Sequence, residues 1–362
     1  MTSIMEIMKE LPEGYQGACY TEKAIQRKRG INDPDNLMML AMFHLVNGSS
    51  LKELSEIARL TKLGNVSDVA LMKRLENCDG WFKWILSQME IAEALEYEKP
   101  QWLEGYEVLA VDATDVAEKG RSGRIYRLHY ALNLFRMQSV YYKITDQKTG
   151  ESLCNFEFKE NDLIIADRMY STFKGIKNCL ESGANFILRF RKNSFNVYDT
   201  KSRKIDLPEM LKKLEEEEIL DLPVFVNLDG KERTQLRICA VRKQEKHLKQ
   251  TEQKLRRRET KKQIEVSVET KEFNNYIVVV TGLPEEIMGK DILELYRLRW
   301  QAEIYFKRLK SIMDFGELPK RRKGSAEAWL NGKLMIALLI ERLMSKRDFP
   351  PNEEPPEQEH LA

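Results

Sequence analysis

One stretch constrains the fold of this chain more than any other: residues 291–312, DILELYRLRWQAEIYFKRLKSI. Apolar residues recur there at alternating spacings of three and four, which is typical of an α-helix with one buried stripe. The stripe consists of Leu295, Leu298, Ala302, Tyr305, Leu309 and Ile312. The spacing predicts a single helix over 291–312 that packs this stripe into a core.

A second face lies beside the stripe, about a quarter to a third of a turn around the predicted helix. It carries Tyr296, Arg299, Glu303, Phe306 and Lys310, so that one acid stands among two bases and two aromatic rings. Because Arg299 and Glu303 are spaced i, i+4, they could simply form a solvated ion pair worth a few tenths of a kcal/mol. On the helix alone, this surface pair is the simpler interpretation.

Two apolar β-runs in the middle of the chain each end in an aspartate. Residues 107–112 read EVLAVD and residues 162–167 read DLIIAD, which predicts strands that end at Asp112 and Asp167. A carboxylate at a buried strand end is costly unless a cation compensates it, and a divalent metal ion can do so. Either aspartate alone could merely cap a turn. Asp115 is a rival to Asp112 for the same role.

The N-terminal part, residues 1–100, has helical patterns, among them 35–47, 50–60 and 67–77. The last two are spaced like a helix-turn-helix, in which Lys73 and Arg74 could reach DNA phosphates. A small structural bundle explains the same pattern equally well.

The remainder predicts a mixed α/β sheet in two parts, 101–191 and 276–348, separated by an insertion over 192–275. The insertion holds short β-runs and a charged segment expected to form an exposed helix. A second apolar helix is expected near 326–344, packed on the sheet. Residues 349–362 are rich in Pro and Glu and are expected to be disordered.

Composition excludes several classes of protein. With 42% hydrophobic and 32% charged residues, the chain should be globular and cytoplasmic, with apolar runs too short to span a bilayer and no secretory signal. Five cysteines without a CxxC pair predict reduced thiols and no zinc site. His129 is the only histidine of the central stretch, which argues against a Ser-His hydrolase. The sequence contains no GxxxxGK[ST] motif, so ATP-driven chemistry is not indicated.

The net charge of +2 hides strong local charge patterning. Residues 242–264 contain ten Lys or Arg against three Glu, and residues 320–323 read KRRK. Such clusters suit a polyanionic partner, although similar runs are common on solvated faces. Charge alone therefore favours nucleic acid only modestly.

Four of these residues have a spacing that resembles a known signature. Tyr296, Arg299, Glu303 and Lys310 are separated by two, three and six residues, as in the Y-R-E-K signature of the insertion-sequence-four family of bacterial DDE transposases. Asp112 in VDAT and Asp167 in ADRMY match that family's first and second catalytic aspartates. Met169 stands where the family usually has a small residue, so the second motif departs from the pattern.

The resemblance implies an RNase H-like mixed-sheet catalytic core, interrupted by a β-rich insertion and preceded by a helical domain that binds DNA ends. It implies that Asp112, Asp167 and Glu303 hold two Mg²⁺ ions, or Mn²⁺ in their place. The residues expected to contact DNA are Tyr296, Arg299, Lys310, Arg168, Lys73 and Arg74.

The implied function is DNA transposition: cleavage at the terminal inverted repeats of an insertion sequence, then joining of the 3′-ends to target DNA, by a nucleoid-associated homodimer. The family extrudes a base and holds it with a tryptophan from the insertion. This insertion has no tryptophan, so Phe273 or Tyr276 would have to substitute, or the ends are processed differently. Two alternatives stay open, namely an inactive end-binding repressor and a stand-alone RNase H-like nuclease.

Overall fold

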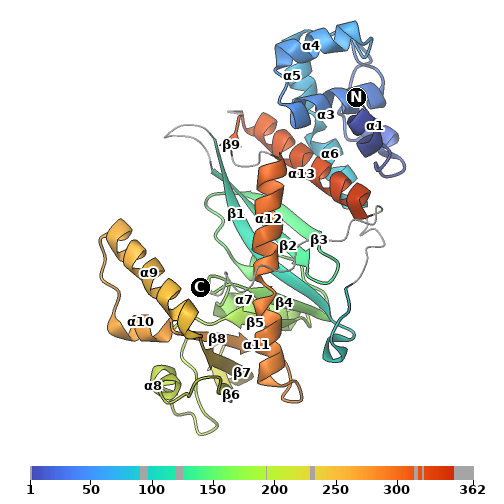
Figure 1. Cartoon of the computed structure of the whole chain (residues 1–362). Coiled ribbons are helices and arrows are strands. Elements are labelled where there is room, and N and C mark those ends of the chain that lie inside the picture. The colour runs from blue at the N-terminus through green and yellow to red at the C-terminus, as the bar shows by residue number, and fades with distance from the viewer. Residues whose placement is uncertain are drawn as a thin grey trace.

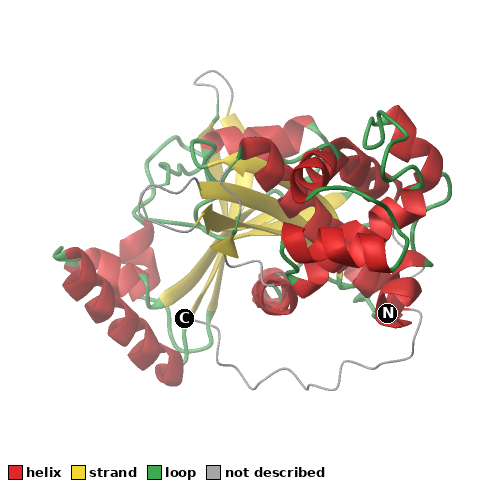
Figure 2. Cartoon of the chain, turned by 90° about the horizontal axis from the view of Figure 1, so that it is seen from above, coloured by secondary structure: helices red, strands yellow, loops and turns green. Residues whose placement is uncertain are grey.

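The computed structural model describes residues 2–89, 97–118, 125–192, 194–228, 233–313, 317–319 and 322–345. They form a mixed β-sheet with helices on both faces, joined to a group of N-terminal helices (Figure 1, Figure 2). The predicted tail, 349–362, lies outside the described residues. No helix within the described ranges is long and apolar enough to cross a membrane.

The sheet has an antiparallel half and a parallel centre. β1, β2 and β3 form an antiparallel meander, β4 and β5 run parallel to β1, and β8, β7 and β6 complete the sheet in antiparallel fashion. The short β9 (Glu317–Leu318) pairs with the end of β1. In spatial order the strands are β3 (Gln138–Asp146), β2 (Ile125–Asn133), β1 (Glu107–Glu118), β4 (Asp162–Ala166), β5 (Asn185–Arg189), β8 (Tyr276–Thr281), β7 (Arg233–Arg242) and β6 (Ile219–Asn227).

This arrangement agrees with the predicted mixed α/β core and is consistent with an RNase H-like fold. One strand end differs from the prediction. β4 ends at Ala166, one residue before Asp167, but β1 continues past Asp112 to Glu118. The reason is that β1 has two partners: its pairing with β4 stops at Val111, whereas its pairing with β2 continues to Ala117. Asp112 therefore stands where the parallel pairing ends.

The insertion extends the main sheet. Its β-runs form β6 and β7, and β7 pairs with β8, which pairs with β5. Its helices are α8 (Leu207–Lys212), α9 (Glu245–Lys262) and α10 (Val268–Phe273). α9 is the charged helix predicted from sequence, and it projects from the side of the molecule (Figure 1).

Among the described residues six α-helices precede the sheet, and serine side chains cap the N-termini of two of them. The Ser67 hydroxyl accepts the N–H of Ala70, and Ser50 forms a capping box with Glu53. The helices are α1 (Thr2–Met8), α2 (Tyr15–Thr21), α3 (Pro34–Asn47), α4 (Leu51–Leu60), α5 (Asp68–Glu76) and α6 (Cys78–Gln88).

The last helix, α13 (Lys323–Ser345), packs mainly against α6, α5 and α3 and also contacts the sheet at β3. The prediction that it packs on the sheet is therefore only partly right. Helix α13 thus belongs with the N-terminal helices and lies beside α6 (Figure 1).

The helix predicted over 291–312 is two helices, α11 (Gly289–Arg297) and α12 (Trp300–Met313). Between them the N–H groups of Leu298 and Arg299 bond to carbonyls three residues back, at 3.0 and 3.1 Å, and those of Gln301 and Ala302 do the same. Bonds of this type make a tight 3₁₀ turn, which changes the phase of the side chains that follow. α12 then runs beside β1 (Figure 1).

Candidate active site

Asp112 lies on the face of the sheet that α11 and α12 cover. Successive side chains of a strand alternate between faces, and Ala110 and Val116 of β1 belong to the core shared with α11, while Val111 belongs to the core on the other face, beneath α7 (Phe173–Glu181). Asp112 follows the alternation of Ala110 and Val116. The strand thus directs this carboxylate toward the helices.

The other two predicted acids, Asp167 and Glu303, both affect the charge of Asp112. The pKa of Asp112 is raised to about 6, chiefly by burial. The N–H of Ala113 and the charge of Arg299 oppose this rise, and the negative charges of Glu303 and Asp167 contribute to it. The Ala113 N–H donates to Asp112 Oδ1 at 2.8 Å. Asp167, after β4, and Glu303, on α12, are therefore near enough to Asp112 on β1 for their charges to affect its pKa.

Asp167 is held by its own loop. Its Oδ1 accepts the N–H of Arg168 at 2.6 Å and lies 3.9 Å from the Arg168 Nε. Arg168 also donates from Nη1 to the Asn274 side chain, at the end of the insertion, at 3.1 Å. Arg168 thus links the Asp167 loop to the insertion.

Glu303 stands in the first turn of α12 and is paired with Arg299. The Arg299 Nη2 lies 2.6 Å from Glu303 Oε1, with side chains 15% and 40% exposed respectively. The pair noted in the sequence exists, but Arg299 is mostly buried in it. Burial opposes the Arg299 charge, yet Tyr296 and Glu303 raise the pKa of Arg299 above its ordinary value. A fully solvated surface pair, the simpler interpretation from the helix alone, does not describe this arrangement.

Tyr296 packs inside the protein. It is 6% exposed, and the Arg189 guanidinium lies 6.0 Å from its ring centre. Arg189, the last residue of β5, is itself buried and donates from Nη2 to the Tyr276 carbonyl at 2.8 Å. Arg189 was not predicted from the sequence. The one feature that could have indicated it is that it ends an apolar β-run, as Asp112 and Asp167 do.

The other predicted contacts lie apart from the acids. Lys73 is exposed on α5, whereas Arg74 donates from Nη2 to the carbonyls of Arg27 and Arg29 at 3.0 and 3.2 Å and so holds a loop. Lys310 lies in α12, but its side chain is outside the described residues. Phe273 and Tyr276, considered as base-holding aromatics, are both 8% exposed.

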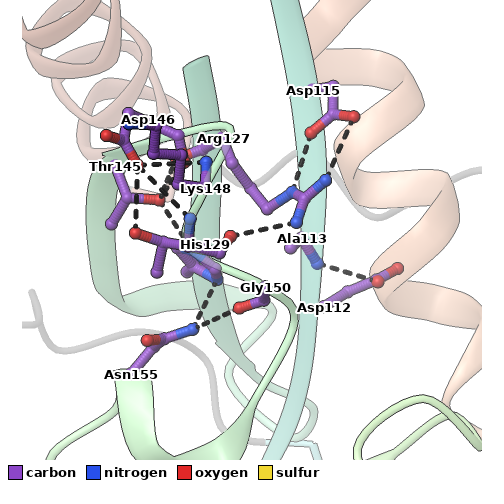
Figure 3. Close-up of polar contacts among 11 residues, drawn as sticks. Asp112, Ala113, Asp115, Arg127, His129, Thr145, Asp146, Lys148, Gly150 and Asn155 are labelled. Atoms are coloured by element: carbon purple, nitrogen blue, oxygen red, sulfur yellow. Dashed lines mark hydrogen bonds and ion pairs between the residues drawn. The ribbon is translucent and has the colours of Figure 1, made fainter. Parts of the chain in front are cut away.

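Asp115, the rival for the first acid, faces the opposite side of β1. Its carboxylate accepts two bonds from Arg127, at 2.8 Å from Nε and 3.3 Å from Nη2, and Arg127 Nη1 donates to the Thr149 carbonyl at 3.0 Å (Figure 3). Asp115 is therefore committed to an ion pair that ties β1, β2 and the loop after β3 together.

The donor set fits a hard divalent cation. Carboxylate oxygens are the ligands that Mg²⁺ or Mn²⁺ prefers, and the Asp167 and Glu303 carboxylates act here on that of Asp112. As they stand, however, no three His, Cys, Asp or Glu side chains of the described residues are arranged to hold a metal ion. One Glu303 oxygen is bonded to Arg299 at 2.6 Å in this arrangement.

Comparison with known proteins shows which family the chain resembles. Residues 103–339 match the family model described as a transposase DDE domain. The putative transposase InsL for insertion sequence element IS186A of Escherichia coli (strain K12) is 27% identical over 347 residues, covering 94% of this chain and 93% of the relative.

Two further relatives carry similar names. The transposase for insertion sequence element IS421 of Escherichia coli is 28% identical over 348 residues, covering 94% of this chain and 93% of the relative. The transposase for insertion sequence element IS231E of Bacillus thuringiensis subsp. finitimus is 26% identical over 218 residues, 56% of this chain and 45% of the relative. Because the matched domain spans more than half of the chain and contains Asp112, Asp167 and Glu303, the chain belongs to the DDE transposase family.

Proposed function

We propose that this protein is the transposase of a bacterial insertion sequence of the insertion-sequence-four family. It cuts DNA at the terminal inverted repeats of its element and joins the 3′-ends to target DNA. The observation that carries the proposal is that the charges of Asp167 and Glu303, far from Asp112 in sequence, both act on the Asp112 carboxylate.

Asp112, Asp167 and Glu303 would hold two Mg²⁺ ions, or Mn²⁺ in their place. When bound, such a pair supplies activation of the attacking hydroxyl and stabilisation of the leaving oxygen in phosphodiester cleavage. The chain's own task is to keep two aspartates on a rigid sheet and the third acid on α12. Rigid placement suits this chemistry because small displacements of reacting groups cost large factors in rate.

Arg299 has two roles in the proposed cycle. Without DNA it neutralises Glu303. A DNA phosphate would draw the guanidinium away by charge-assisted hydrogen bonds and leave Glu303 free for the metal site. Tyr296 and Arg189 would hold the turn between α11 and α12 in place during this exchange.

DNA would also be held at a distance from the acids. We assign end binding to the N-terminal helices, with Lys73 of α5 contacting phosphate, and we assign contact near the cleavage site to the insertion with its basic helix α9. The active form would be a homodimer that pairs two element ends, in the cytoplasm at the nucleoid.

An in vitro assay tests the proposal. Duplexes carrying the element's own inverted repeats are incubated with Mg²⁺ and either wild type or Asp167→Asn. We expect nicking at the repeat ends by wild type alone. Equal nicking by the variant would refute the metal site. Binding of the ends without any cutting would indicate an inactive repressor, and cutting without preference for the repeats would indicate a general nuclease.

A further inference from the structure

Tyr130 of β2 stands directly opposite Asp112 in the β1–β2 ladder. Residues opposed in an antiparallel pair project from the same face, with Cβ atoms about 5 Å apart. Tyr130 is 2% exposed, and the charge of Asp112 acts on its phenol. The phenol therefore lies inside the acid-bearing face, beside the first acid of the site.

The surroundings of Tyr130 favour a hydroxyl that donates. Burial raises the pKa of Tyr130 well above its ordinary value, and the charges of Asp112 and Glu303 act in the same direction. A protonated phenol gives the Asp112 carboxylate a neutral partner that leaves its negative charge in place. This differs from Arg299, which cancels the charge of Glu303.

We propose that Tyr130 is a positioning residue for the divalent-cation site. Its hydroxyl fixes the rotamer of Asp112, so that the carboxylate lone pairs left free by Ala113 and Tyr130 are turned toward α12 and Glu303. This inference rests on the proposed function, because it presumes that Asp112 binds the cation. Hydrogen-bonding partners of metal-binding carboxylates orient them, and loss of such a partner typically weakens metal affinity by about 10–100-fold.

The same strand offers a matched control. Tyr126 lies four residues earlier on β2, on the same face, and is 6% exposed. It stands opposite Val116, and its hydroxyl has no hydrogen-bonding partner among the described residues. Tyr126→Phe therefore removes a buried hydroxyl from the same sheet face without touching an acid.

The test measures cation binding separately from catalysis. Mn²⁺ is titrated into full-length wild type, Tyr130→Phe and Tyr126→Phe, each with and without DNA carrying the repeat ends, and free Mn²⁺ is followed by electron paramagnetic resonance. We expect Tyr130→Phe to weaken Mn²⁺ binding about 10-fold and Tyr126→Phe to leave it unchanged. Thermal unfolding midpoints close to that of wild type should accompany both results.

A second readout separates positioning from loss of the site. In the nicking assay, Tyr130→Phe should raise the Mg²⁺ concentration needed for half-maximal rate, with the rate recovering at high Mg²⁺. Unchanged Mn²⁺ binding and an unchanged Mg²⁺ requirement would overturn the inference, as would an equal loss in Tyr126→Phe. If Asp167→Asn abolishes nicking while Tyr130→Phe behaves as wild type, only this inference fails and the proposed function stands.

Discussion

Asp112 and Asp115 lie three residues apart on one strand and have opposite surroundings (Figure 3). Asp115 is half-exposed and is bound by both nitrogens of one edge of the Arg127 guanidinium. Asp112 is more deeply buried, accepts a backbone N–H, and has two further acids acting on its charge.

The difference separates a structural acid from a functional one. A carboxylate that already has its cation, such as Asp115, contributes to the sheet and has little left to offer a ligand. Asp112 is partly buried and its carboxylate accepts a backbone N–H rather than a bond from a cationic side chain, which favours binding of a metal ion. The predictions below test whether the Asp112 face of β1 serves function and the Asp115 face serves stability.

The largest effect should come from Asp112→Asn. Loss of one metal-binding carboxylate removes several kcal/mol of transition-state stabilisation, so nicking should fall by about 10³-fold or more. The measurement is the single-turnover nicking rate with Mg²⁺. Asp115→Asn is the matched variant and should nick at close to the wild-type rate; the reverse ranking would assign the first acid to Asp115.

On the Asp115 face, His129 should make the fold sensitive to acid. Its ring is buried, its Nε2 lies 3.0 Å from the Thr145 hydroxyl, and burial lowers the pKa of His129 to about 4. Between pH 6.5 and 4 the unfolded chain binds a proton that the folded chain does not. The free energy of unfolding should therefore be unaffected by this group above about pH 6.5 and fall by roughly 3 kcal/mol toward pH 4.

Urea denaturation of wild type and His129→Gln across this pH range checks the prediction. The variant should lose this part of the pH dependence, although its overall stability will be lower. A parallel pH response in the two proteins would show that the acid sensitivity arises elsewhere.

Arg299→Gln removes the guanidinium that is paired with Glu303. The Glu303 carboxylate should then lack a bonded cationic side chain, as the Asp112 carboxylate does. Nicking should fall by about 10²-fold, as for loss of one charged donor in an active site. Mn²⁺ binding measured without DNA should instead become tighter, since Glu303 is released. A fall in both quantities would contradict the exchange of Arg299 between Glu303 and DNA.

The smallest effect should come from Asp115→Asn on stability. The pair with Arg127 is partly exposed, so its loss should lower the free energy of unfolding by only about 1 kcal/mol. Urea denaturation gives the value, and unchanged Mn²⁺ binding in the same sample is the control. A larger loss of Mn²⁺ binding than of stability would place Asp115 in the metal site.

Sequence patterns predicted the strands that carry Asp112 and Asp167 because both lie in apolar β-runs. They could not locate the end of β1, since that depends on two partner strands whose pairing stops at different residues. The turn at Leu298 was missed because the apolar spacing continues through it, although the backbone bonding changes there. Tyr296, which precedes the turn, is buried against Arg189, whereas Glu303, which follows it, is 40% exposed.

The partners of the acids were the least predictable part of the site. Tyr130 and Arg189 sit in apolar strand sequences, and their roles come from the residues opposite them across the sheet or in α11. A helical projection placed Arg299 toward solvent because it contains no information on the sheet beneath the helix. Composition and spacing thus identified the acids but not the residues that orient them.

The central claim is that Asp112, Asp167 and Glu303 together hold the divalent cation that DNA cleavage requires. The most direct measurement is a crystal structure of the protein bound to an element end and soaked with Mn²⁺, with the ion located by its anomalous scattering. The account predicts Mn²⁺ contacting Asp112 and Asp167, with Glu303 released from Arg299. Mn²⁺ bound at Asp115, or Glu303 still bonded to Arg299 beside bound Mn²⁺, would contradict it.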